Sequence, residues 1–211
     1  MSTRIVVIGG GIAGVSAAYH LLEVHPGADV VLLEMEATLA QHTTGRSAAL
    51  LLENLGTPSA RALCSASVSF LREPPDDLVD APLLAHRPVL HVATLEQSDQ
   101  VDRMLEDGTS ATTPTLEVDL DEAMRLFPPL RRERLHRAIV EPGSADIDVG
   151  ALHQAFVRGF RRAGGRIATS TRVDAARPSG DGWCLDTTDG EVWADLVVNA
   201  AGAWGDVVAL G

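Results

Sequence analysis

The feature that most constrains the fold is a glycine cluster between a short apolar run and a longer stretch of small and apolar residues. Residues 4–8 are rich in β-branched side chains, which is typical of a strand buried on both faces of a parallel sheet. Residues 12–24 contain no proline and carry apolar side chains at helical spacing. A second buried-strand pattern follows at residues 30–33. The order predicts a strand–helix–strand unit with parallel strands, and therefore an α/β fold.

Within the cluster, Gly9, Gly11 and Gly14 fit the pattern G-x-G-x-x-G. In such units the first glycine permits the tight turn and the second lets a pyrophosphate approach the backbone. The third lets the helix pack closely on the strand. The exposed amides and the positive dipole end of the helix then hold the diphosphate. The pattern alone is a weak signal, but here it follows a predicted strand and opens a predicted helix, so we predict a dinucleotide coenzyme at this turn.

An acid stands at the expected distance from this turn. Glu34 ends the second predicted strand, 20 residues after Gly14. Its carboxylate can accept hydrogen bonds from both ribose hydroxyls and disfavours a 2′-phosphate, which favours NAD or FAD over NADP. The alternative is a glycine-rich turn without a ligand, but its glycines would cost chain entropy with no packing benefit. The local pattern leaves FAD and NAD both open.

Composition excludes several function classes. All 17 cationic side chains are arginine, so a lysine Schiff base and a Gly-Lys-Ser/Thr phosphate loop are both excluded. The 29 acids give a formal net charge of −12, which disfavours nucleic acids and anionic membranes as partners. Cys64 and Cys184 are far apart, so neither a disulfide framework nor a zinc site is predicted. With no signal peptide and no apolar run of membrane-spanning length, we expect a cytoplasmic location and no integral membrane segment.

The rest of the chain predicts one discontinuous α/β domain. Residues 46–55 suggest a short helix, and residues 58–71 a longer one with Thr57 as its N-cap. Residues 74–140 are interrupted by prolines and resemble a smaller inserted segment. Alternation then resumes, with a strand at 137–141, a helix at 149–163, and strands at 166–168, 183–187 and 195–199.

Three separated segments resemble the cofactor-binding signatures of a known family: Val6–Gly14, Thr44–Ala49 and Val198–Trp204. The family is that of the FAD-dependent D-amino-acid oxidases and dehydrogenases (DAO), and the strongest similarity is to bacterial D-arginine dehydrogenases. Further similarity at residues 56–58, 82–84 and 143–153 extends the resemblance over essentially the whole chain. It implies a Rossmann-like, glutathione-reductase-like FAD-binding domain, with a parallel sheet and a β-meander, interrupted by part of a substrate lobe. On this basis residues 1–73 and 141–211 form the FAD-binding domain, and residues 74–140 a partial substrate or cap segment.

The resemblance also implies an activity and a set of cofactor-binding positions. In this family FAD takes a hydride from the substrate α-carbon, and the resulting imine hydrolyses to a 2-oxo acid and ammonia. The implied positions are Gly9, Gly11, Ala13 and Gly14 for the diphosphate, Glu34 and Met35 for the adenosine, Thr43, Thr44, Gly45, Arg46, Ser47, Ala48 and Ala49 for the ribityl-flavin side, Val173 for the adenine, and Ala201 and Gly202 for close backbone approach.

The chain departs from the family pattern in two ways. Family members are considerably longer, so we expect this chain to be an N-terminal portion that lacks most of the substrate lobe. At the substrate-binding positions, Leu50, Leu55 and Val89 stand where D-arginine dehydrogenases have histidine, tyrosine and glutamate. A cationic group buried beside Val89 would lack its countercharge, at a cost of several kcal/mol. We therefore expect an uncharged, apolar amino acid or amine as the small-molecule substrate.

No residue is a convincing catalytic acid, base or nucleophile, and the electron acceptor and oligomeric state are not determined by the sequence. A non-catalytic module or subunit that binds FAD or NAD is the alternative function. For His42 a plain loop role is favoured over contact with flavin or substrate, and for His153 a place in the core over catalysis. Asp146 and Asp148 are better explained as helix caps than as metal ligands, so no metal is expected.

Overall fold

The computed structural model describes residues 2–210, and the chain divides into two compact units. Unit 1 comprises Met1–Ala48, Asp76–Val79 and Val149–Gly211, and unit 2 comprises Ala49–Pro75 and Asp80–Asp148. These limits differ from the predicted boundaries at residues 73/74 and 140/141. Residues 49–75 fall in unit 2 because their first strand pairs with a strand at residues 145–147.

Unit 1 is built on a four-stranded sheet in the order β13-β1-β2-β9, and all of its pairings are parallel. Its strands are β1 (Arg4–Ile8), β2 (Asp29–Leu33), β9 (Arg166–Ala168) and β13 (Leu196–Asn199). The apolar side chains of β1 are buried, as expected for a strand covered on both faces. The predicted parallel sheet is confirmed.

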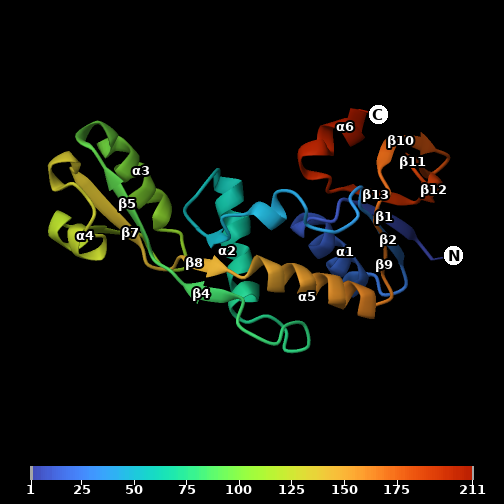
Figure 1. Cartoon of the computed structure of the whole chain (residues 1–211), viewed down its shortest axis with the longest axis horizontal. Helices are drawn as coiled ribbons and strands as arrows, with labels where there is room; N and C mark the ends of the chain where they lie inside the picture. Colours follow the sequence, from blue (N-terminus) through green and yellow to red (C-terminus); the bar gives the residue numbers. More distant parts are fainter. Residues whose placement is uncertain (1, 211) are drawn as a thin grey trace. The chain divides into compact units, whose positions relative to one another are not determined.

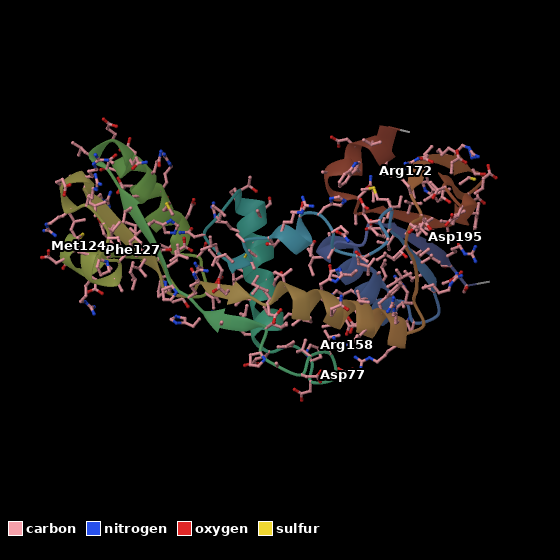
Figure 2. All side chains as sticks on the ribbon, in the orientation of Figure 1. Asp77, Met124, Phe127, Arg158, Arg172 and Asp195 are labelled. Atoms are coloured by element: carbon pink, nitrogen blue, oxygen red, sulfur yellow. The ribbon has the colours of Figure 1, made fainter. Side chains whose placement is uncertain are left out.

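Two helices of unit 1 pack side by side, α1 (Ile12–Val24) and α5 (Val149–Arg162) (Figure 1). The helices approach closely at Gly159, where a Cβ would lie 2.6 Å from the ring of Tyr19. Two arginines of α5 donate hydrogen bonds to the segment Asp76–Val79. Arg158 donates to the carbonyl of Leu78 at 3.2 Å and Arg162 to that of Asp77 at 2.6 Å; Figure 2 labels Arg158 and Asp77.

A three-stranded antiparallel meander completes unit 1, formed by β10 (Val173–Ser179), β11 (Gly182–Thr187) and β12 (Gly190–Ala194). It is followed, after β13, by the short helices η4 (Gly202–Trp204) and α6 (Gly205–Leu210). One apolar cluster joins the parallel sheet, the meander and α6, and includes Val6, Leu33, Leu185 and Val208. The predicted combination of parallel sheet and meander is therefore present.

Unit 2 contains two small antiparallel sheets, in the orders β3-β8-β4 and β5-β7-β6. The strands are β3 (Leu50–Leu51), β4 (Leu84–His86), β5 (Val89–Ala93), β6 (Leu116–Val118), β7 (Arg137–Glu141) and β8 (Ala145–Ile147). The helices are α2 (Pro58–Arg72), α3 (Ser98–Gly108) and α4 (Leu120–Leu126), with the short turns η2 (Leu95–Gln97) and η3 (Arg132–Arg134). No helix within residues 2–210 has the length and apolar character needed to cross a membrane.

The predicted short helix at residues 46–55 is wrong. The chain instead forms a single 3-10 turn, η1 (Thr44–Arg46), and then the strand β3. Between them Ala49 adopts a left-handed backbone conformation with φ of 57°, which ends any helical continuation. Leu50 and Leu51 pair with Asp146 and Ala145, a non-local contact that local periodicity does not reveal.

Candidate functional site

The glycine turn, residues 9–14, connects β1 to α1 and is shaped by two close backbone contacts. Gly9 has φ of 108° and donates its N–H to the carbonyl of Leu33 at 2.8 Å. A Cβ on Gly9 would collide with the carbonyl oxygen of Ala200, and one on Gly14 with that of Gly9. Both positions therefore require glycine, as the motif predicted.

Helix α1 begins at this turn without the usual side-chain cap. Its N-cap residue, Gly11, offers no side chain to the helix amides, and the first turn contains no acidic residue. The amide of Ile12 donates to Oγ1 of Thr44 at 2.9 Å, so residue 44 lies across the start of the helix. The positive end of the helix dipole carries no compensating carboxylate of its own, which fits the binding of an anion there.

Glu34 lies at the carboxyl end of β2 and is 8% exposed. Its Oε2 accepts the amide of Gly10 at 2.6 Å, and its Oε1 accepts the amide of Glu36 at 2.9 Å. Each carboxylate oxygen has two lone-pair sites, so each retains one for a further donor such as a ribose hydroxyl. The carboxylate is held in place by the same turn that would hold the phosphates.

These groups face a cavity of about 480 Å³, within the size range of small-molecule and cofactor sites. Its lining residues all belong to unit 1. They come from the glycine turn, the end of β2, residues 40–44, the start of β10 and residues 200–208. Segments far apart in the sequence thus meet around the start of α1.

Most of the predicted cofactor-binding residues line this cavity. They are Gly9, Gly11, Ala13, Glu34, Met35, Thr43, Thr44, Val173, Ala201 and Gly202. Gly14, Gly45, Arg46, Ser47, Ala48 and Ala49 are absent from the lining. Gly14 serves helix packing, and a Cβ on Gly45 would collide with the carbonyl of Ala40, so these two glycines shape the backbone behind the cavity.

The three predicted substrate-binding residues lie in unit 2. Leu55 is 66% exposed, whereas Leu50 in β3 and Val89 in β5 are half-buried. Val89 is the cross-strand partner of Glu141 on β7. Their contact with a substrate stays a prediction.

Two aromatic residues of the cavity were not predicted as site residues. The rings of His42 and Trp204 lie 4.6 Å apart between centroids, and both residues line the cavity. Nε2 of His42 is 3.0 Å from Oε1 of Glu36. His42 lies in a turn, as predicted, and it also lines the cavity. In the sequence, the position of His42 next to the Thr44–Ala49 segment was the only indication that it lies at the site. Its ring contact with Trp204 depends on the tertiary fold.

His153 is 2% exposed, as its core assignment predicted, and its Nε2 lies 2.9 Å from the carbonyl oxygen of Gly10. Asp146 forms an ion pair with Arg87 at 2.8 Å. Within residues 2–210, a single group of three potential metal ligands comes close together: Cys184, Asp186 and Glu191 in the meander. There the guanidinium of Arg177 contacts both carboxylates, at 3.1 and 2.5 Å, and supplies the positive charge.

Comparison with known proteins gives one family over nearly the whole chain. The model of the family described as FAD dependent oxidoreductase (DAO) matches residues 4–211. The mitochondrial dimethylglycine dehydrogenase of Rattus norvegicus is 29% identical over 202 residues, which cover 94% of this chain and 23% of that protein. The L-2-hydroxyglutarate dehydrogenase of Indibacter alkaliphilus is 23% identical over 214 residues, covering 99% of this chain and 52% of that protein. The chain thus spans between about a quarter and a half of the length of these relatives.

Solved structures share the fold. L-proline dehydrogenase from P. horikoshii superposes with a TM-score of 0.84 at 21% identity, over 99% of this chain and 55% of that one. Glycine oxidase from Geobacillus kaustophilus superposes with a TM-score of 0.79 at 24% identity, over 99% of this chain and 58% of that one. At these identities the likeness establishes the architecture.

Proposed function

Because the chain belongs to the FAD dependent oxidoreductase family, whose cofactor is FAD, we propose that it is the FAD-holding part of an enzyme that oxidises the C–N bond of an amino acid or related amine. The observation that carries the proposal is the uncapped start of α1, which faces a cavity beside the buried carboxylate of Glu34. A diphosphate and a ribose are the groups that these two features suit.

Different residues of unit 1 bind different parts of the cofactor. The amides of the glycine turn hold the diphosphate, and the free lone pairs of Glu34 accept the ribose hydroxyls. Val173, at the start of β10, would offer backbone groups to the adenine, and Thr43 and Thr44, which also line the cavity, would contact the ribityl-flavin side. When bound, FAD supplies the acceptor for a hydride from the substrate α-carbon. The substrate is thereby oxidised to an imine, and water then releases ammonia and a 2-oxo acid.

For the substrate, we propose a D-amino acid or related amine with an uncharged, apolar side chain. The support is the apolar character of Leu50, Leu55 and Val89 themselves, since none of these side chains supplies a countercharge to a cationic substrate. Relatives and structural neighbours include proteins named for dimethylglycine, glycine and L-proline, none of which has a charged side chain. The two separated free cysteines support a reducing cytoplasm as the location.

The first experiment is to purify the protein and record its visible spectrum. We expect a yellow protein with bound flavin, and a colourless protein that binds NAD instead would contradict the proposal. Under anaerobic conditions, D-leucine or D-methionine should bleach the flavin at least tenfold faster than D-arginine, with L-leucine as the control for stereochemistry. Faster bleaching by D-arginine would refute the proposed substrate class.

A non-catalytic FAD- or NAD-binding module is the second candidate. It is favoured by the lining of the cavity, since all of the lining residues lie in unit 1, whereas the predicted substrate-binding residues lie in unit 2. A yellow protein that no amine bleaches would support this candidate over the enzyme.

A further inference from the structure

His153 makes one polar contact with the glycine turn from a distant part of the chain. It lies on α5, is almost fully buried, and places Nε2 at 2.9 Å from the carbonyl oxygen of Gly10. A carbonyl oxygen only accepts hydrogen bonds, so Nε2 carries the proton and donates it. The same oxygen accepts the amide of Ala40 at 3.2 Å.

The direction of this carbonyl fixes the direction of the next amide. The carbonyl of Gly10 and the N–H of Gly11 belong to one planar trans peptide, in which they point in opposite directions. The carbonyl points to α5, which contributes no residue to the cavity lining among residues 2–210. The N–H of Gly11 therefore points away from α5, and Gly11 lines the cavity at the start of α1.

Without an external contact this peptide would be poorly fixed. Gly9, Gly10 and Gly11 are consecutive, and glycine populates both signs of φ with little preference, so a peptide between two glycines can rotate easily. The amide on the other side of Gly10 is held by Glu34 at 2.6 Å. The carbonyl side is held by the hydrogen bond from His153, at 2.9 Å, and by the longer one from Ala40, at 3.2 Å, and with the Glu34 contact they define one orientation of residue 10.

We propose that His153 is a positioning residue for the cofactor phosphates: its Nε2–H orients the Gly10–Gly11 peptide so that the Gly11 N–H donates to the diphosphate. This inference rests on the proposed function of the cavity. His153 lies outside the cavity, and a purely structural role in the core would not give it an effect on phosphate binding. The inference assigns it such an effect.

The test compares a ligand that carries the diphosphate with one that lacks it. Isothermal titration measures ADP and adenosine binding to the wild-type protein, to His153→Leu, which has no donor, and to His153→Gln, whose side-chain amide can donate at a similar reach. We expect His153→Leu to weaken ADP binding by about 5- to 10-fold, as for loss of one hydrogen bond, and adenosine binding by less than twofold. His153→Gln should restore ADP binding to within twofold of the wild type.

Leu152→Ala is the matched control, since Leu152 is a buried neighbour on α5 with no contact to Gly10 among the hydrogen bonds described. It should lower the melting temperature without changing the ratio of ADP to adenosine affinity. Equal weakening of both ligands by His153→Leu, or no weakening, would overturn the inference. A wild-type protein that binds neither ligand would instead count against the proposed function.

A second measurement needs no folded leucine variant. In protein labelled with ¹⁵N-histidine, the resonance that disappears in His153→Gln belongs to His153 and should show a protonated Nε2 and an unprotonated Nδ1. The opposite tautomer would also overturn the inference, because Nε2 could then not donate to Gly10.

Discussion

The starts of helices α1 and α4 differ in how their free amides are satisfied. In α4 the carboxylate of Asp119 accepts the amide of Glu122 at 2.7 Å, and two more acids stand in the first turn. In α1 the N-cap is Gly11, with no side-chain cap and no acid in the first turn. Helix α2 resembles α4, since Oγ1 of Thr57 accepts the amide of Ala60 at 3.3 Å.

The difference separates helices whose N-terminal amides are accepted by their own N-cap side chain from a helix whose N-terminal amides need an acceptor from elsewhere. Asp119 and Thr57 stabilise their own helices with side chains a few residues away, at a gain of about 1 kcal/mol each. The start of α1 has no such cap from its own N-cap residue, receives one acceptor from the distant Thr44 at the Ile12 amide, and faces a cavity of about 480 Å³. An uncapped helix start beside a cavity thus indicates an anion site, whereas a capped one indicates a structural helix.

The largest expected effect comes from filling the space at Gly14. Gly14→Ala places a Cβ against the carbonyl oxygen of Gly9, so the helix must move away from the strand. We expect the free energy of unfolding to fall by more than ~2 kcal/mol. Flavin binding should fall by at least ~100-fold, about 2.7 kcal/mol, because the phosphate-facing amides move with the helix. Thermal melting and bound-flavin absorbance measure the two effects.

Gly27→Ala is the control for this change, because a Cβ there meets nothing within 4 Å. It should leave both the melting temperature and the flavin content close to wild type. A Gly14→Ala protein that is as yellow and as stable as the control would show that the close contact is not required.

A smaller effect is expected when α1 receives the acid that α4 already has. Ala13→Asp adds a carboxylate in the first turn, at an exposed position that lines the cavity. The cofactor-free protein should gain about 0.3–1 kcal/mol from the helix dipole. Flavin binding should weaken by about tenfold or more, because the new charge repels the diphosphate.

Ala13→Asn provides the neutral comparison, since it changes size without charge. Calorimetric melting of the apo protein and flavin titration are compared for both variants. If the aspartate and asparagine variants bind flavin equally well, the start of α1 does not face the phosphates.

The smallest expected effect is at the capped helix. Asp119→Ala removes the side-chain acceptor for the Glu122 amide and should cost about 1 kcal/mol of stability, a few degrees in melting temperature. Flavin binding should change by less than twofold, whereas Asp119→Asn, which keeps an acceptor, should recover most of the stability. A tenfold weakening of flavin binding in Asp119→Ala would contradict the distinction between a capped structural helix and a helix start that binds the cofactor.

Local patterns predicted the first strand–helix–strand unit with the observed bounds of β1 and α1, and the cap at Thr57. These predictions succeeded because each depends on residues within a few positions of one another. The helix predicted at residues 46–55 failed because Leu50 and Leu51 form a strand by pairing with residues 145–146. The unit boundaries differed from the predicted ones for the same reason.

By itself, the sequence determined that a glycine turn joins a buried strand to a helix, with an acid at the end of the next strand, since periodicity and backbone freedom are local properties. Only the tertiary structure decided which groups meet that turn: Thr44 at the amide of Ile12, Trp204 against His42, and His153 at the carbonyl of Gly10, which is 143 positions away. Such contacts arise from the packing of whole elements, whose relative placement depends on buried surface summed over the fold rather than on any short stretch of residues.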